Sequence, residues 1–388
     1  MRALAMGCVL LGLLWGACED EPPPAPPPPP PPAPPRVEVA APRELATDAS
    51  FDLVVGSRGP LWIYGAPSEA GGELRLVPLD RRGGAAGPER TLVGGGSVGS
   101  ELPPDAVEIA AGAADGRLAV AWVRRNQTQL SVRAAYGDDA GEAFSPPVAL
   151  GPTLRTRAGG RGHVAVAAEA NDFEVLHRGD LGPCEEGAPP ERPRCTRMGV
   201  TRLGPGTTER RGVGLALPQP CERAVVGFAS VGGVWYYALC DGSGGAPATT
   251  VFAVQFEPRY AHAERVLEGC APRGLVPFGD GVVVLGRCDE GMRGMRIASA
   301  GRALQPLSGA PRVDCLDGRP RVRIDAWEDR WDAPRERVEA LLPEEVAPEG
   351  SRAVWTGEAV LIATPLGREV ALRRYECGRG GFHRTDHE

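Results

Sequence analysis

A glycine-rich segment, Gly94 to Gly99, carries two local patterns that could build a catalytic or cofactor site. It contains GxSxG, which presents a nucleophilic serine, and GxGxxG, which cradles the phosphates of a dinucleotide. Both patterns require a strand before them and a helix after them. The following residues, Ser100 to Pro104, end in two prolines and cannot start that helix. We therefore interpret the segment as a loop and assign no catalytic residue.

Two histidines near the end of the chain could bind a metal. His383 and His387 have i, i+4 spacing, which places both on one face if the segment is helical. Glycines at 378, 380 and 381 and the terminal position instead favour a flexible tail over residues 379–388. We therefore expect neither a metal site nor a cofactor.

A tryptophan pair marks a possible ligand loop. Trp327 and Trp331 lie within Asp325–Asp332, which also contains four acidic residues. Their ring faces could stack on a sugar or a cationic ligand. Alternatively, both rings anchor an irregular insertion in the core. The sequence leaves these two interpretations open.

The composition excludes several function classes. The chain has 43 basic residues, all of them arginine, and a formal net charge of −7. Without lysine, P-loop and protein-kinase phosphate chemistry and Schiff-base mechanisms are excluded. The acidic balance makes nucleic acid an unsuitable partner.

Eight cysteines indicate an oxidising compartment. Cys8 and Cys18 lie in the N-terminal segment, and the rest of the chain holds an even number without any CxxC spacing. An even set in an exported chain predicts disulfides rather than a zinc site. We predict four bridges in sequence order: Cys184–Cys195, Cys221–Cys240, Cys270–Cys288 and Cys315–Cys377.

The N-terminal segment predicts export. Residues 1–17 combine one arginine, a short apolar run and small residues at Gly16 and Ala17, as in a signal peptide. The small-small-Cys ending resembles the lipobox of bacterial lipoproteins. That resemblance implies acylation of Cys18, a membrane partner through the lipid anchor, and a place in the bacterial envelope, in the outer membrane with the domain in the periplasm or on the cell surface. Simple secretion is the alternative.

A proline-rich stalk follows. Residues 18–35 include Pro22–Pro35, with 12 prolines, which must adopt extended polyproline II. At about 3.1 Å per residue this piece reaches roughly 43 Å. We interpret it as a spacer, with a ligand for a proline-binding domain as the other possibility.

Residues 36–378 predict an all-β domain. Short apolar runs separated by Gly and Pro recur about every 47 to 61 residues, in groups of three or four strands. The second strand of each group, such as Leu61–Tyr64, is almost continuously apolar, as expected for a strand buried between neighbouring sheets. We predict a β-propeller of four-stranded antiparallel blades.

Two further expectations concern the number of blades and the closure of the ring. The segment Asp332–Leu342 looks helical and follows a weak repeat, so six blades with an insertion and seven blades both remain open. The last repeat shows three strands. We expect the strand at residues 36–40, just after the stalk, to supply the fourth and close the ring.

One turn carries a family resemblance. In Tyr136–Phe144, three positions, Asp139, Gly141 and Phe144, resemble the Asp-box of sialidase-like (BNR-type) propellers. The resemblance implies a structural turn in which Asp139 accepts backbone N–H bonds, Gly141 adopts positive φ and Phe144 covers the hairpin.

The function expected from these observations is binding. We expect a non-enzymatic propeller that presents a blade face or its central mouth to a protein or glycan. The alternative is a diverged sialidase-like hydrolase. The resemblance implies that such an enzyme needs three arginines, a tyrosine and two carboxylates in one central pocket.

Overall fold

The computed structural model describes residues 50–384, with gaps at 67–72, 95–105, 127–128, 152–153, 156–161, 170–171, 184–193, 206, 212–214, 244, 257–259, 298–304, 307–311, 317–318, 325–326, 331–336, 368 and 379–380. These residues form seven antiparallel sheets. None of the helical turns in this part of the chain has the length and hydrophobicity needed to cross a bilayer.

Six of the sheets are blades that follow one another along the chain. Blade 1 consists of β1 (Phe51–Gly56), β2 (Gly59–Ala66), β3 (Glu73–Pro78) and β4 (Arg90–Val93). Blade 2 consists of β5 (Ala106–Ala114), β6 (Arg117–Asn126), β7 (Gln129–Asp138) and β8 (Val148–Ala149), with β9 (Leu154–Arg155) also pairing with β7. Blade 3 consists of β10 (Val164–Glu169), β11 (Asp172–Pro183), β12 (Arg194–Gly204) and β13 (Thr207–Arg211), with β14 (Ala216–Leu217) also pairing with β12.

The remaining blades have the same order. Blade 4 consists of β15 (Pro220–Val231), β16 (Val234–Asp241), β17 (Ala248–Gln255) and β18 (Tyr260–Val266). Blade 5 consists of β19 (Ala271–Phe278), β20 (Gly281–Cys288), β21 (Gly291–Ile297) and β22 (Gln305–Pro306). Blade 6 consists of β26 (Arg352–Trp355), β27 (Ala359–Leu366), β28 (Glu369–Gly378) and β29 (Gly381–Arg384).

The hairpins between first and second strands are set by local turn chemistry. Asp115 and Gly116, which join β5 to β6, both have positive φ, and so do Gly232 and Gly233 between β15 and β16. Two-residue loops of type I′ need this conformation at both positions, and their twist matches that of the flanking strands. The sequence therefore fixes the register of these strand pairs locally.

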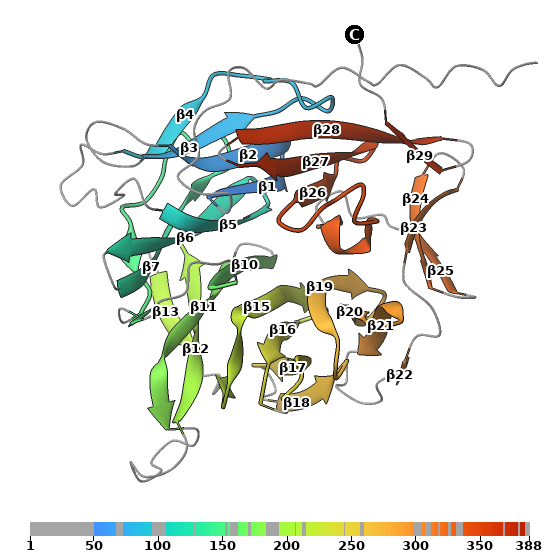
Figure 1. Cartoon of the computed structure of the whole chain (residues 1–388). Helices are drawn as coiled ribbons and strands as arrows, with labels where there is room; N and C mark the ends of the chain where they lie inside the picture. The colour runs from blue at the N-terminus through green and yellow to red at the C-terminus, as the bar shows by residue number, and fades with distance from the viewer. Residues whose placement is uncertain are drawn as a thin grey trace, which may run out of the picture. The chain divides into compact units, whose positions relative to one another are not determined.

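Six apolar clusters lie between the blades and close the ring. Each cluster contains residues of two successive blades, and the last one joins blade 6 to blade 1. Along β2, Leu61 and Ile63 pack against blade 2, whereas Trp62 and Tyr64 pack against blade 6. The second strands are apolar on both faces for this reason, as the sequence predicted. Figure 1 shows the first strands β1, β5, β10, β15, β19 and β26 around a common centre.

The contact between blades 5 and 6 differs from the other five. Residues 337–350, which we call the wedge, contain the 3₁₀ helix η1 (Glu339–Leu341) and lie between β19 and β26. Val338 and Leu342 of the wedge are buried in the cluster shared by the two blades. The helix expected at residues 332–342 is thus a single 3₁₀ turn at its C-terminal end, and residues 331–336 lie outside the described residues.

The seventh sheet settles the blade number at six plus an insertion. It consists of β23 (Arg312–Leu316), β24 (Arg319–Ile324) and β25 (Trp327–Arg330). It contacts β28 and β29, the outer strands of blade 6, so it lies beside blade 6 rather than in the ring.

The closing strand differs from the one we expected. β29 pairs with β28, with Tyr375 opposite Arg384, and supplies the fourth strand of blade 6. The domain therefore extends to Arg384, beyond the expected boundary at residue 378, and residues 381–384 are a strand rather than a flexible tail. The strand expected at residues 36–40 lies outside the described residues. This strand was not evident from the sequence because its glycines suggested a frayed end. Pairing with β28 orders the segment, since it satisfies the backbone N–H and C=O groups.

Candidate functional site

A small cavity lies at the centre of the ring. It has a volume of about 110 Å³ and is lined by blades 2 to 6 and by the wedge. One part of its wall is apolar, with Val164, Val226, Phe228 and Leu275 among the lining residues. The other part is charged: Glu108, Arg273, Arg337, Glu339 and Arg352.

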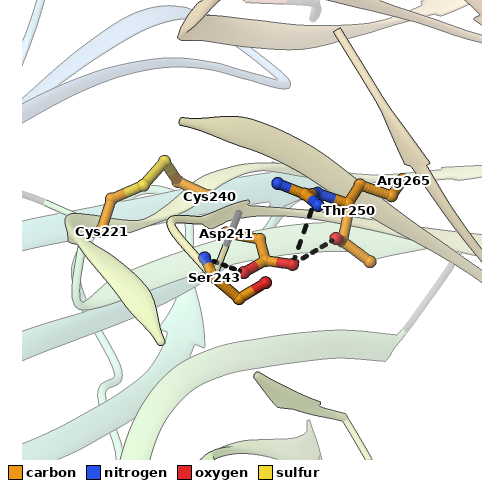
Figure 2. Close-up of a disulfide and its surroundings, with 6 residues drawn as sticks. All are labelled: Cys221, Cys240, Asp241, Ser243, Thr250 and Arg265. Carbon is orange, nitrogen blue, oxygen red and sulfur yellow. Dashed lines mark hydrogen bonds and ion pairs between the residues drawn. A yellow bond between two sulfur atoms is a disulfide. The ribbon is translucent and has the colours of Figure 1, made fainter. Parts of the chain in front are cut away.

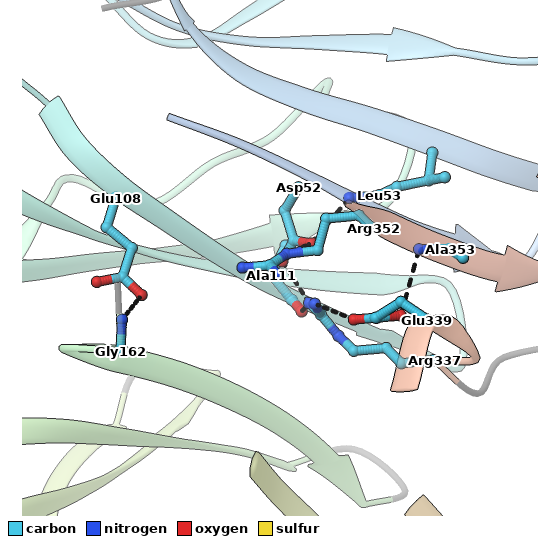
Figure 3. Close-up of polar contacts among 9 residues, drawn as sticks. All are labelled: Asp52, Leu53, Glu108, Ala111, Gly162, Arg337, Glu339, Arg352 and Ala353. Atoms are coloured by element: carbon cyan, nitrogen blue, oxygen red, sulfur yellow. Dashed lines mark hydrogen bonds and ion pairs between the residues drawn. The ribbon is translucent and has the colours of Figure 1, made fainter. Parts of the chain in front are cut away.

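The buried carboxylate of Asp52 organises the charged part. Asp52 lies in β1, is fully buried, and accepts the backbone N–H of Ala111 on blade 2 at 2.7 Å. Arg337 of the wedge donates to the same oxygen, and Nε of Arg352 on blade 6 lies 3.3 Å from the other oxygen. Figure 3 shows both guanidinium groups at this carboxylate. One side chain therefore ties together blade 1, blade 2, blade 6 and the wedge.

Arg337 has additional partners that fix its position. It donates to the carbonyl of Ala111 at 3.2 Å and lies 3.7 Å from a carboxylate oxygen of Glu339. Glu339 in turn accepts the backbone N–H of Ala353 at 3.2 Å. Burial alone would lower the pKa of Arg337, but the carboxylates of Asp52 and Glu339 outweigh that effect and raise it. Arg337 is therefore a permanent cation in a structural role.

Glu108 makes the equivalent connection one blade further on. Its two carboxylate oxygens accept the backbone N–H groups of Gly162 at 2.8 Å and His163 at 2.9 Å, at the start of blade 3. A third carboxylate, Glu174 of blade 3, accepts the hydroxyl of Tyr237 on blade 4 at 3.0 Å. Buried carboxylates thus connect three successive blade pairs, and each satisfies donors of the next blade.

The cavity contains part of the set that a sialidase-like hydrolase would need. Arg273, Arg337 and Arg352 are three arginines, and Glu108 and Glu339 are two carboxylates. The residues that line it, taken from the described ranges, include no tyrosine. Tyr237 and Glu174 form a tyrosine–glutamate pair, but both are fully buried between blades 3 and 4, where burial, followed by the charge of Glu174, raises the pKa of Tyr237.

The Asp-box turn adopts the expected shape with a different aspartate in the capping position. Gly141 has φ of 72°, as predicted. The backbone N–H groups of Glu142 and Ala143 donate to Asp138, at 3.0 and 2.6 Å, and not to Asp139. Partial burial raises the pKa of Asp138, and these N–H bonds more than reverse this, so the pKa is lowered.

Asp139 instead connects two blades. Its carboxylate accepts the backbone N–H of Ser57, in the β1–β2 turn of blade 1.

Phe144 forms a β-bridge with Gly137 and packs partly buried against the cluster between blades 1 and 2. A Cβ at Gly137 would lie only 2.3 Å from the Phe144 ring and 2.2 Å from the carbonyl oxygen of Ala143. The glycine at the usual Ser position is thus required by the close packing of Phe144.

Two of the four predicted disulfides are confirmed, Cys221–Cys240 and Cys270–Cys288. Figure 2 shows the first beside Asp241, whose carboxylate accepts the N–H of Ser243 at 2.9 Å. Cys195 and Cys377 are also disulfide-bonded. The side chains of their predicted partners, Cys184 and Cys315, lie outside the described residues, so those two pairings stay predictions.

Several other predicted site residues cannot be placed in a site. Trp327 begins β25, but its side chain and the whole of Trp331 lie outside the described residues. Cys18, the stalk and His387 also lie outside them. His383 falls in β29, so the i, i+4 spacing with His387 does not belong to a helix.

The residues that do meet at the centre were not singled out by the sequence. Asp52 and Glu108 each stand in an otherwise apolar first strand, FDLVVG and AVEIAAG. A lone acid in such a strand was the available signal, because burial of a carboxylate requires partners. Their partners lie on other blades and could not be read from spacing.

Comparisons with known proteins return similar structures only. No family model and no curated protein matches the chain. The chain is similar to the Trypanosoma rangeli sialidase in complex with sialic acid, at 10% identity and a TM-score of 0.35, over 71% of this chain and 52% of that one. A structure from an analysis of two prolyl endopeptidases has 11% identity and a TM-score of 0.41, over 88% and 50%. The family 117 glycoside hydrolase Zg3597 of Zobellia galactanivorans has 11% identity and a TM-score of 0.31, over 53% and 70%.

The chain spans about half the length of the sialidase and the prolyl endopeptidase it resembles. The class of protein, a six-bladed β-propeller, follows from the sheets and the six clusters between them.

Proposed function

We propose that this protein is an exported, non-enzymatic propeller that binds a protein or glycan partner at the cell envelope. The observation that carries the proposal is that the charged side chains at the centre of the ring hold neighbouring blades together. Asp52 and Glu108 bind backbone N–H groups of neighbouring blades, and Arg337 is ion-paired to Asp52. Groups committed to holding blades together are poorly placed to take part in proton transfer or nucleophilic attack.

The size of the cavity supports a binding role over catalysis. At about 110 Å³ it is smaller than the roughly 150 Å³ of a protein cavity that takes up benzene. A sugar ring with its hydroxyl groups is larger than benzene, so the cavity could not enclose it. A partner would therefore be bound on the surface of the blades, which rigid blade contacts keep preformed.

The N-terminal sequence supports the location. An acylated Cys18 and the stalk at residues 18–35 would hold the domain away from a bacterial membrane, with the outer membrane as the proposed site. Disulfides are typical of exported proteins, and the two described here support export. Mass spectrometry of the mature N-terminus tests the anchor: a diacyl or triacyl mass on Cys18 supports it, and an unmodified N-terminus contradicts it.

Affinity capture tests the binding role. The mature protein, immobilised through its N-terminal segment, is exposed to solubilised native envelope and washed at high salt. We expect one envelope protein or glycan to be retained, and to be lost when soluble domain is added as competitor. Retention of nothing above a blank matrix would contradict the proposal.

A diverged glycoside hydrolase is the second candidate. The observation in its favour is the meeting of three arginines and two carboxylates in one cavity. Turnover of a fluorogenic sialoside or of other aryl glycosides by the purified protein would support it.

A further inference from the structure

A second hollow lies between the first and last blades. It is an open groove with a volume of about 450 Å³, within the range of ligand-binding pockets. All six residues that line it are charged, three of them basic and three acidic: Asp80, Arg81, Arg82, Glu358, Arg374 and Glu376. It is separate from the central cavity, with which it shares no lining residue.

The blade 1 wall of the groove is a well-fixed loop. Asp80 accepts the backbone N–H groups of Arg82 at 2.7 Å and Gly84 at 2.9 Å, which closes a tight turn after β3. Gly83 in this turn has φ of 88° and packs against Leu361 of blade 6. The turn therefore fixes the backbone of Arg81 and Arg82, which removes the backbone part of the ordering cost on binding.

The blade 6 wall contains a buried cation. The side chain of Arg374 is only 9% exposed and forms an ion pair of 2.6 Å with Glu376. Its Nε has no hydrogen-bond partner among the described residues. Arg81 pairs with Glu358 across the two blades, and Arg82 forms no ion pair with a residue that the structure describes.

The charges in the groove balance. Three guanidinium groups and three carboxylates sum to zero, so a polyanion or a polycation would meet as many like charges as opposite ones. The groove provides guanidinium groups, which are strong donors, beside carboxylates, which are strong acceptors.

From these contacts we infer that the groove between blades 1 and 6 binds an uncharged, hydroxyl-rich glycan. A hydroxyl group both donates and accepts, so neighbouring hydroxyls of a sugar can satisfy carboxylate and guanidinium groups together. The inference rests on the proposed binding function and specifies its site and its partner class.

The chain provides a matched pair of variants for the test. Arg81 is 65% exposed and pairs with Glu358, which is 53% exposed. Arg287 on blade 5 is 64% exposed and pairs with Glu344, which is 49% exposed. R81A removes a groove donor, whereas R287A removes an equally exposed arginine from an equivalent surface ion pair outside the groove.

The purified mature protein is applied to an array of neutral and acidic oligosaccharides, and affinities are measured for the bound ones. We expect a neutral oligosaccharide to bind, with a Kd that changes less than twofold between 50 and 500 mM salt, because no net charge is neutralised. R81A should weaken this binding at least tenfold and R287A less than twofold.

Three results would overturn the inference. One is binding of acidic glycans only, with affinity that falls steeply with salt. Another is neutral glycan binding that R81A and R287A leave equally strong, which would place the glycan elsewhere and keep the binding function. The third is an absence of any bound glycan; envelope capture of a protein would then sustain the binding function alone.

Discussion

Arg337 and Asp52 are 285 positions apart in the sequence, and their side chains form an ion pair at the centre of the ring. Arg352 completes the arrangement from blade 6. Because Asp52 of blade 1 also accepts a backbone N–H of blade 2, its carboxylate connects the first, second and last blades and the wedge. The ring is thus closed at its centre by ion pairs to the buried carboxylate of Asp52, in addition to the apolar contact of blade 6 with blade 1.

Removing the charge of Asp52 should destabilise the fold strongly. In Asp52→Asn the cations Arg337 and Arg352 lose the carboxylate between them. Breaking a buried ion pair on one side typically costs about 3–5 kcal/mol. Urea unfolding measures this. Asp289→Asn, in the exposed turn between β20 and β21, is the control and should change stability by less than about 0.5 kcal/mol; equal losses in the two variants would be inconsistent with a central role for Asp52.

Acid should destabilise the protein through His177. Burial, opposed by a hydrogen bond with the backbone of Arg178 and reinforced by the charge of Arg210, lowers the pKa of His177 from 6.5 to about 4. Because the folded pKa is the lower one, stability is complete above pH 6.5 and is lost as pH falls from 6.5 toward 4.

The matched variant isolates this effect from other titrating groups. Between pH 7 and pH 5 the wild type should lose about 2 kcal/mol more unfolding free energy than His177→Gln, which cannot titrate. Parallel pH profiles for the two proteins would show that His177 titrates normally.

Restoring the serine of the Asp-box should be harmful. The Cβ of Gly137→Ser would overlap the carbonyl of Ala143 and the Phe144 ring. Such overpacking costs about 1–3 kcal/mol. Gly94→Ser, where a Cβ would make an ordinary 3.4 Å contact with Thr91, is the control. A G137S protein as stable as G94S would show that the turn can accommodate the family's residue.

Each described disulfide should contribute stability separately. Cys221–Cys240 and Cys270–Cys288 close loops of 19 and 18 residues, for which chain entropy predicts roughly 3 kcal/mol each. Replacing either pair by alanine should lower the unfolding free energy by about that amount. A double-pair variant that unfolds at the wild-type denaturant concentration would refute the estimate.

The sequence predicted the parts of the fold that local pattern controls. The apolar second strands, such as Leu61–Tyr64, identified the blades because both faces of these strands are buried. It left open whether the weak repeat before Asp332 is a seventh blade, and the structure shows that this repeat is the sheet of β23 to β25 beside blade 6. β24 reads RPRVRI, with charges at alternate positions, which suits a sheet beside the ring rather than a strand between two blades.

The candidate site was much less predictable. Asp52, Glu108 and Arg337 act through partners on other blades, and sequence spacing carries no information on such contacts. The capping residue of the Asp-box turn was assigned one position too late because Asp138 and Asp139 are adjacent. Only the backbone shows that the first caps the turn and the second reaches Ser57.

One experiment decides most directly whether the charged residues at the centre of the ring serve structure or catalysis. The purified mature protein and its Glu108→Gln variant are assayed against a panel of fluorogenic glycosides, including a sialoside, and their unfolding is measured in parallel. We expect no turnover above the enzyme-free rate for either protein, together with a clear loss of stability in the variant. Turnover by the wild type that disappears in a stably folded Glu108→Gln protein would contradict it.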